Sequence, residues 1–512
     1  MLSKLFGCTV VGTMLLSTSA MATVTITSTE GNFRVEGELQ SFEDNLYLLQ
    51  TDFGRLLIDA AIAVCEGEDC PEIVTEDYNF RIALAMGMRD DALPMILSSA
   101  LTANGHSAKL ETSEGRTVVN AVAADNRQLG AVTVERTEAD AAFQALLNRE
   151  VDVILTDRRA TNDEVEAFIT AGLGNPLDAS NETIFAQDAI VLATSPSNPV
   201  RNITLEDAEG IFSGRIRNWS ELGGPDRPID VLMPKGPSSL VDGFERAVLY
   251  PFFSSFGGGI DRTNAQADVA GAIVENPGAI GIVSSAEIGG AEQMVLTRDC
   301  GLETMATPFN IRSEDYPLAR RMYAYSMSNN KAVSDTLSFL TSPDGQATVD
   351  RFGYVSLSPD TSDLNGLGKQ LAYSLVAPEA AESLSDLRRF TQEVIGATRL
   401  STTFRFASGS SQLDNKARAD VERLAELLSL PQYEGAEVLL VGFTDSIGAN
   451  NVNAVLSERR AGQVLEEITQ TAGSSIDPNR FRLMGFGETY PAACNSDQDG
   501  RDLNRRVEVW LR

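Results

Sequence analysis

An aspartate and an arginine near the end of the chain have residue types and a spacing suited to a ligand with two opposite charges. Asp445 follows the apolar run 438–441, and Arg460 lies in the amphipathic segment that comes next. Apolar residues recur in that segment at helical spacing, which places Arg460 along the apolar stripe and Arg459 on the solvent side. We therefore expect Arg459 to be exposed and Arg460 to be buried.

Two interpretations of the buried arginine stay open from the residues alone. A buried charge is costly without a partner, and Asp445 is the natural partner for Arg460. The two could form a structural ion pair that fixes strand to helix. Alternatively they could flank a cleft, where Arg460 binds a carboxylate with its planar guanidinium and Asp445 binds an ammonium group. Gly448, in the loop between them, permits a close backbone approach.

The elements that must position these side chains form a compact final unit over residues 399–512. Short apolar runs predict strands at 402–406, 437–443 and 505–511, and helical spacing predicts helices at 416–428 and 452–471. The order is therefore βαβαβ, in a segment about the size of one domain.

This final unit resembles the OmpA-like peptidoglycan-binding domain, with motifs in the usual order and spacing. The matching motifs are Thr402-Phe-Arg-Phe, Gly442-Phe-Thr-Asp445-Ser-Ile-Gly448, Asn453, Leu456-Ser-Glu-Arg-Arg460-Ala, Gly485-Phe-Gly-Glu488 and Asn504-Arg-Arg-Val-Glu508. The resemblance implies that Asp445 and Arg460 hold the diaminopimelate residue of a stem peptide through its ammonium and carboxylate groups. Asn453 and Thr444 assist them, and residues 504–506 mainly close the sheet edge.

Residues 76–358 have a different pattern, in which apolar strand-like runs alternate with helical segments. This pattern predicts an α/β fold, and its length suits two lobes. The segment resembles periplasmic solute-binding proteins of the PstS phosphate-binding type. The matching motifs are Ile211-Phe-Ser-Gly-Arg-Ile-Arg-Asn-Trp219-Ser-Glu-Leu-Gly-Gly, Asn276-Pro-Gly-Ala-Ile-Gly281 and Tyr316-Pro-Leu-Ala-Arg320.

The anion-binding motifs of that family are only partly present. The resemblance carries over five candidate anion-binding residues: Ser238, Ser239, Thr156, Asp157 and Arg158. Leu240 stands where the family has a threonine, and the early loop at 84–87 has no hydroxyl group. Each lost donor removes about 1 kcal/mol or more in a dry site. Phosphate, an altered ligand and no ligand therefore all stay open.

The remaining segments complete a multidomain architecture of mixed α/β and α+β class. Residues 1–22 have a positive charge, an apolar stretch and a small-x-small cleavage pattern, which predict a signal peptide. Short alternating runs at 23–75 predict a small antiparallel β module. Residues 359–398 form a linker, with a helix expected from 379 to 394.

Four cysteines remain after the predicted cleavage, and an exported chain meets oxidising conditions. Cys65 and Cys70 are predicted to close a tight loop, and metal ligation is the rival interpretation. Cys300 and Cys494 could pair across domains or stay free, and the sequence does not decide between these states.

The formal charge of −31 excludes nucleic acid as a partner, because nothing would neutralise its phosphates. The single histidine, His106, lies in a predicted turn, and no nucleophile motif or metal motif accompanies it.

We expect a non-catalytic periplasmic protein without cofactor or metal, bound to the cell wall near the outer membrane of a Gram-negative-type envelope. Its middle domain would bind phosphate or another small solute, with an ABC transporter as a further partner. The alternative is a purely structural or interaction protein whose solute-binding fold has lost its pocket.

Overall fold

The computed structural model describes residues 23–28, 33–43, 46–67, 70, 78–89, 91–113, 115–262, 265–363, 367–377, 380–408, 410, 412–473 and 476–512. The predicted signal peptide, residues 1–22, lies outside these described residues. The chain divides into two units at residues 76 and 77. The predicted mixed multidomain architecture, with its β module, two-lobed domain and C-terminal α/β domain, is confirmed.

The first unit is the predicted β module. Its strands are β1 (Thr23–Ser28), β2 (Arg34–Glu43), β3 (Leu46–Thr51), β4 (Gly54–Asp59) and β5 (Ala63–Glu66). They form one sheet in the order β4-β3-β2-β1-β5. Alternate residues of β1 and β3 are buried, as the period of a strand requires. The predicted Cys65–Cys70 disulfide is confirmed, with Cα atoms 5.7 Å apart.

The middle domain is built on a sheet of order β13-β14-β11-β18-β10-β6-β9-β8-β7. Its strands are β6 (Phe80–Ala85), β7 (Ser107–Ser113), β8 (Arg116–Val122), β9 (Gln128–Thr137), β10 (Val153–Thr156), β11 (Glu182–Thr194), β13 (Asp230–Leu232), β14 (Ala279–Ser284) and β18 (Ala319–Ser326). Smaller strands are β12 (Asn202–Thr204), β15 (Glu292–Gln293), β16 (Val295–Thr297) and β17 (Glu303–Thr304). Its helices are α1 (Ala92–Ala103), α2 (Ala139–Leu147), α3 (Asn162–Thr170), α4 (Leu205–Phe212), α5 (Ser239–Phe244), α6 (Val269–Glu275), α7 (Pro308–Arg312), α8 (Lys331–Thr341) and α9 (Pro343–Arg351).

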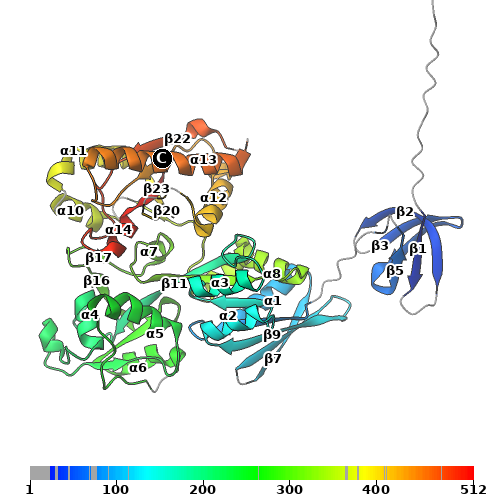
Figure 1. The fold of residues 1–512 in the computed structure, drawn as a ribbon, viewed down its shortest axis with the longest axis horizontal. Coiled ribbons are helices and arrows are strands. Elements are labelled where there is room, and N and C mark those ends of the chain that lie inside the picture. Colours follow the sequence, from blue (N-terminus) through cyan, green and yellow to red (C-terminus); the bar gives the residue numbers. More distant parts are fainter. Residues whose placement is uncertain are drawn as a thin grey trace, which may run out of the picture. The chain divides into compact units, whose positions relative to one another are not determined.

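Separate hydrophobic cores divide this domain into two lobes. We call residues 78–188 and 320–354 lobe 1, and residues 189–319 lobe 2. Strands β11 and β18 are shared, because the first half of β11 pairs with β18 and its second half pairs with β14. Figure 1 shows α1, α2 and α3 in one lobe and α4, α5 and α6 in the other. The two shared strands are therefore the connection about which the lobes could move.

The C-terminal domain has a sheet of order β19-β20-β23-β21-β22. Its strands are β19 (Thr361–Ser362), β20 (Thr398–Arg405), β21 (Val438–Gly442), β22 (Phe481–Gly485) and β23 (Arg506–Leu511). Its helices are α10 (Gly368–Val376), α11 (Ala380–Val394), α12 (Asn415–Leu428), α13 (Asn450–Ala472) and α14 (Gln498–Asn504). Figure 1 shows α10 and α11 grouped with α12 and α13 around this sheet.

Alternating residues of β21 supply cores on both faces of the sheet. Leu440 packs with α12 and α13, whereas Val441 packs with α11 through Phe390. The expected helix in the linker is therefore part of the C-terminal domain's core. The sequence pattern did not predict β19, β22, α10 or α14. The edge strand β22 has mostly half-buried residues, which leaves a weak hydrophobic pattern.

Candidate functional site

Two glycines let helix α13 lie directly on the sheet and so position Arg460. A Cβ atom on Gly442 would stand 2.0 Å from the carbonyl oxygen of Ser457, and one on Gly485 would stand 2.3 Å from that of Ala454. No side chain fits in those gaps, so the helix backbone contacts both strands. Arg460 consequently reaches the region beyond the end of β21, where the chain continues into Asp445.

Asp445 is 8% exposed and is held from two sides. Its Oδ1 accepts a hydrogen bond from the backbone N–H of Ile447 at 3.0 Å. Its Oδ2 accepts from Nη1 of Arg505 at 2.6 Å. Arg505 also donates to the carbonyl oxygen of Phe406 and to Asp502. The carboxylate is thus fixed in place by an arginine that follows helix α14.

Arg460 is 2% exposed, whereas Arg459 is exposed, as the helical spacing predicts. Among the described residues, the Nε and Nη1 atoms of Arg460 have no hydrogen-bond partner. The guanidinium lies over the ring of Phe406, 5.3 Å from its centroid. Burial lowers the pKa of Arg460 and Arg505 lowers it further, while Asp445 opposes them. A buried guanidinium with unused donors is suited to an incoming carboxylate.

Three further predicted residues surround these charges. Asn453 donates from Nδ2 to the backbone oxygen of Asp445 at 3.3 Å and to Glu488 at 2.9 Å. Gly448 has a φ of +113°, and a Cβ there would approach Asn453 to 3.3 Å. Within the described part of the chain, the buried hydroxyl oxygen of Thr444 has no partner.

The structure corrects one expectation about this site. Asp445 was the natural partner of Arg460, but it forms its ion pair with Arg505. Arg505 therefore does more than close the sheet edge, which was the role expected of residues 504–506. The Asn504-Arg-Arg motif was visible in the sequence, yet nothing in it showed that the first arginine turns toward Asp445. Arg505 is shared by the carboxylates of Asp445 and Asp502, whereas Arg460 keeps unused donors that suit a ligand with an anionic group.

The second candidate site is the contact between the lobes of the middle domain. Asp157 at the end of β10 accepts a hydrogen bond from the hydroxyl of Ser239 at 2.7 Å. Asp157 belongs to lobe 1 and Ser239 to lobe 2, so this bond joins the lobes. Arg320 pairs with Asp157, and with Asp188 at 2.6 Å. A Cβ on Gly87 would stand 1.8 Å from the Ser239 hydroxyl oxygen, which shows how closely the lobes meet.

The structure thus brings some of the predicted anion-binding residues together and separates others. Ser238 is buried beside Ser239 and contacts Gln266 at 3.3 Å. Thr156 is buried, and its hydroxyl accepts a hydrogen bond from the backbone of Arg158. The Arg158 side chain turns to Glu164 and Asp140, at 2.6 Å from each.

Arg320 supplies a guanidinium in the cleft that the sequence motifs did not indicate. It ends the motif Tyr316-Pro-Leu-Ala-Arg320, which supported the family resemblance without pointing to a binding role. Its neighbours Asp157 and Asp188 are both buried. Asp188 also accepts hydrogen bonds from Ser284 and Ser285 of lobe 2. Arg320 thus pairs with both carboxylates at the floor of the cleft, while the buried Oδ1 atom of Asp157 has no hydrogen-bond partner among the described residues.

Open space lies beside the Ser239–Asp157 contact. A cavity of about 240 Å³ is bordered by the carboxylates of Glu138, Asp140, Asp242 and Glu245 and by Arg158 and Arg246. Burial raises the pKa of Asp242, Arg246 opposes this, and Asp157 adds to it. A second cavity of about 400 Å³ is bordered by Arg136, Lys235, Ser238 and Glu287. Any ligand in the cleft would meet both signs of charge.

The described residues give no indication of a metal site or of a membrane-spanning helix. Over that part of the chain, no three His, Cys, Asp or Glu side chains gather as they would around a metal ion. Likewise, none of the helices in the described ranges combines the length and apolar character needed to cross a bilayer.

Two family matches cover separate parts of the chain. Residues 112–344 match the PBP superfamily domain, and residues 405–505 match the OmpA family. The chain is 24% identical over 239 residues to the phosphate-binding protein PstS of Borreliella burgdorferi, covering 44% of this chain and 80% of that protein.

Relatives of the C-terminal domain match over shorter lengths. Outer membrane porin F of Pseudomonas aeruginosa is 33% identical over 116 residues, which cover 23% of this chain and 32% of the porin. The peptidoglycan-associated lipoprotein of Legionella pneumophila is 36% identical over 103 residues, which cover 20% of this chain and 56% of the lipoprotein. The chain thus spans less than two thirds of each of these two relatives.

Proposed function

We propose, from the premise that this chain joins a PstS-like PBP domain to a C-terminal OmpA domain, that the protein is a non-catalytic envelope protein attached to peptidoglycan. The C-terminal domain would hold the diaminopimelate residue of a stem peptide. Arg460 would bind its carboxylate, Asp445 its ammonium group, and Asn453 and Thr444 would assist.

One observation carries this proposal. Arg460 is buried beside Asp445 and Arg505, and its Nε and Nη1 atoms have no partner among the described residues. Buried donors are almost always satisfied in folded proteins, so an unsatisfied guanidinium beside a carboxylate needs an explanation. A zwitterionic head group would supply a carboxylate for Arg460 and an ammonium for Asp445.

The experiment is sedimentation of the full-length protein with diaminopimelate-containing sacculi. We expect Asp445→Ala and Arg460→Ala each to weaken retention at least about tenfold, because each removes a charged hydrogen bond worth about 1.5–3 kcal/mol. Arg459→Ala is the matched control, since Arg459 is exposed on the same helix and should leave retention unchanged.

The result that would contradict the proposal is retention of both variants at the level of the unmodified protein. A thermal melt of each variant separates loss of binding from loss of folding. Should both variants merely unfold, the two charges would be a structural feature rather than a binding site.

For the middle domain we propose a solute-binding role in the envelope, with a small solute as ligand, of which phosphate is the one to test first, and an ABC transporter as partner. The PBP match and the PstS relative support this role. The second candidate is a structural or interaction domain with no ligand. The Ser239–Asp157 hydrogen bond favours it, because the lobes already contact each other at the candidate anion-binding residues.

The proposed location rests on the same relatives. Porin F is an outer membrane protein and the lipoprotein is peptidoglycan-associated by name, which supports a place in a Gram-negative-type periplasm near the outer membrane. Fractionation of cells that express the full chain tests this, and recovery in the cytoplasm would contradict it.

A further inference from the structure

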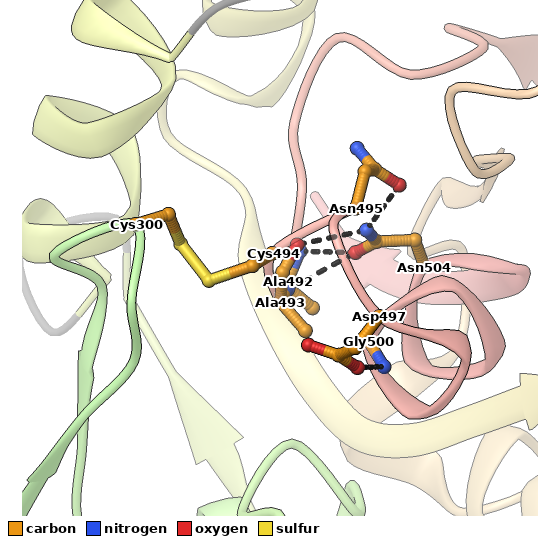
Figure 2. The surroundings of a disulfide bond; sticks show 8 residues. All are labelled: Cys300, Ala492, Ala493, Cys494, Asn495, Asp497, Gly500 and Asn504. Atoms are coloured by element: carbon orange, nitrogen blue, oxygen red, sulfur yellow. Dashed lines mark hydrogen bonds between the residues drawn. A yellow bond between two sulfur atoms is a disulfide. The ribbon is translucent and has the colours of Figure 1, made fainter. Parts of the chain in front are cut away.

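The C-terminal domain contacts both lobes of the middle domain, and the contact with lobe 2 is covalent. Cys300 in lobe 2 forms a disulfide with Cys494, with Cα atoms 5.8 Å apart. This settles the pairing that the sequence left open. Figure 2 shows the bond beside a loop held by Asn504, whose Oδ1 accepts from the backbone N–H groups of Ala492 and Ala493. The disulfide thus joins lobe 2 to an ordered part of the C-terminal domain.

An ion cluster strengthens the attachment to lobe 2. Asp315, which lies just before β18, pairs with Arg399 at 2.9 Å and with Arg405 at 2.8 Å. Both arginines are on strand β20 of the C-terminal domain. Arg405 also donates to the carbonyl oxygen of Ser313 at 2.8 Å. These groups are largely buried, so the contact is a packed interface rather than a surface ion pair.

A separate set of bonds attaches the same domain to lobe 1. Asp414 pairs with Arg321 of β18 at 2.6 Å. Asn415, the next residue, donates to the Glu182 carboxylate at 2.6 Å and to the carbonyl oxygen of Leu177 at 2.8 Å. Glu182 begins β11, so this strand is held at its lobe 1 end, whereas Arg321 lies near the start of β18, where the two lobes join. The C-terminal domain therefore bridges the two lobes.

Adjacent arginines on β18 connect this bridge to the floor of the cleft. Arg321 binds Asp414 of the C-terminal domain, while Arg320 binds Asp157 and Asp188 at the floor of the cleft. A lobe movement that separated Ser239 from Asp157 would change the path of β18 or β11. It would therefore strain the bonds made by Asp414 and Asn415.

We propose that the C-terminal domain is an intramolecular brace that holds the two lobes together with the cleft closed. The disulfide fixes the brace to lobe 2 and makes its bonds to lobe 1 intramolecular, at high effective concentration. Solute entry then requires the brace to release one lobe. This inference goes beyond the proposed function, since it holds whether or not the domain also binds peptidoglycan.

The test is amide hydrogen exchange of the full-length protein, read at the cleft segments 84–89 and 238–244. The double variant Cys300→Ser/Cys494→Ser removes the covalent attachment of the C-terminal domain to lobe 2. Asp414→Ser with Asn415→Ala frees the lobe 1 end, and serine keeps the N-cap that Asp414 provides to α12. Cys65→Ser with Cys70→Ser is the matched control, because it removes a disulfide of the first unit.

We expect exchange at the cleft segments to rise at least about fivefold in both brace variants and to stay unchanged in the control. Unchanged exchange in the Asp414/Asn415 variant, which retains both disulfides, would overturn the proposal even if the cysteine variant fails to fold. Exchange in the core strand β14 reports unfolding separately. Sedimentation with sacculi should be unaffected in the Asp414/Asn415 variant, so failure of the brace and failure of wall binding are distinguishable.

Discussion

At the scale of single residues, the C-terminal site is defined by which charges are paired and which are not. Arg505 neutralises Asp445, so Arg460 keeps its unpaired donors although a carboxylate is near. A ligand with only an ammonium group would compete with Arg505 for Asp445. A ligand that also has a carboxylate gains the Arg460 interaction, so a zwitterion fits this site better than a simple amine.

In the middle domain, residue-scale chemistry predicts poor phosphate binding. Asp157 already accepts hydrogen bonds from Ser239 and Arg320, and Leu240, which has no hydroxyl group to offer, is fully buried in the core. We expect calorimetry of the full-length protein to give a flat trace at millimolar phosphate. A saturable heat would contradict this expectation. A heat found only in the Asp414→Ser/Asn415→Ala variant would mean that the brace excludes phosphate, rather than the residues themselves.

At the scale of elements, the site depends on the direct contact between α13 and the strands β21 and β22. Replacing Gly442 by alanine places a methyl group 2.0 Å from the Ser457 carbonyl oxygen, so the helix must shift. We expect Gly442→Ala to lower the free energy of unfolding by about 1–3 kcal/mol. Sedimentation with sacculi should weaken too, because Arg460 moves with the helix.

The control substitution lies on α13, the helix that packs against Gly442. A Cβ on Gly462 would meet only Leu483, at an ordinary distance of 3.8 Å. Gly462→Ala should therefore raise stability by about 0.5–1 kcal/mol through helix propensity. Chemical denaturation measures the free energy of unfolding of both variants. Equal changes from the two substitutions would show that the helix does not need this close contact.

At the scale of the whole molecule, partly buried carboxylates at the brace make its stability depend on pH. Asp315 and Asp414 are accompanied there by Glu314, which pairs with Arg321 at 2.6 Å. Burial alone would raise the pKa of these three carboxyl groups, but the neighbouring arginines together have the larger effect and lower it. Their folded pKa values lie below the unfolded ones, which are about 4. Their contribution is therefore complete above the unfolded values and is lost as the pH falls through the folded values.

We accordingly expect the Tm of the full-length protein to fall when the pH is lowered from 7 to 3. Many carboxylates contribute to acid destabilisation, so Asp414→Ser supplies the comparison. It lacks one carboxylate with a lowered pKa and should lose less Tm between pH 7 and pH 3 than the unmodified protein. An equal loss in the two proteins would show that Asp414 contributes no linked stability.

Local patterns determined much of this protein. Periodicity separated the buried Arg460 from the exposed Arg459, and the spacing of Cys65 and Cys70 predicted their disulfide, because these features depend on neighbours in the chain. Motifs likewise predicted the two-lobed domain and the C-terminal domain.

Tertiary structure decided what depends on residues far apart in the sequence. Only the fold brings Arg505 to Asp445, Ser239 to Asp157 and Cys494 to Cys300. The edge strand β22 is recognisable as a strand only from its parallel pairing with β21. A sequence pattern records the environment along one element, whereas an ion pair between distant segments depends on how the elements pack.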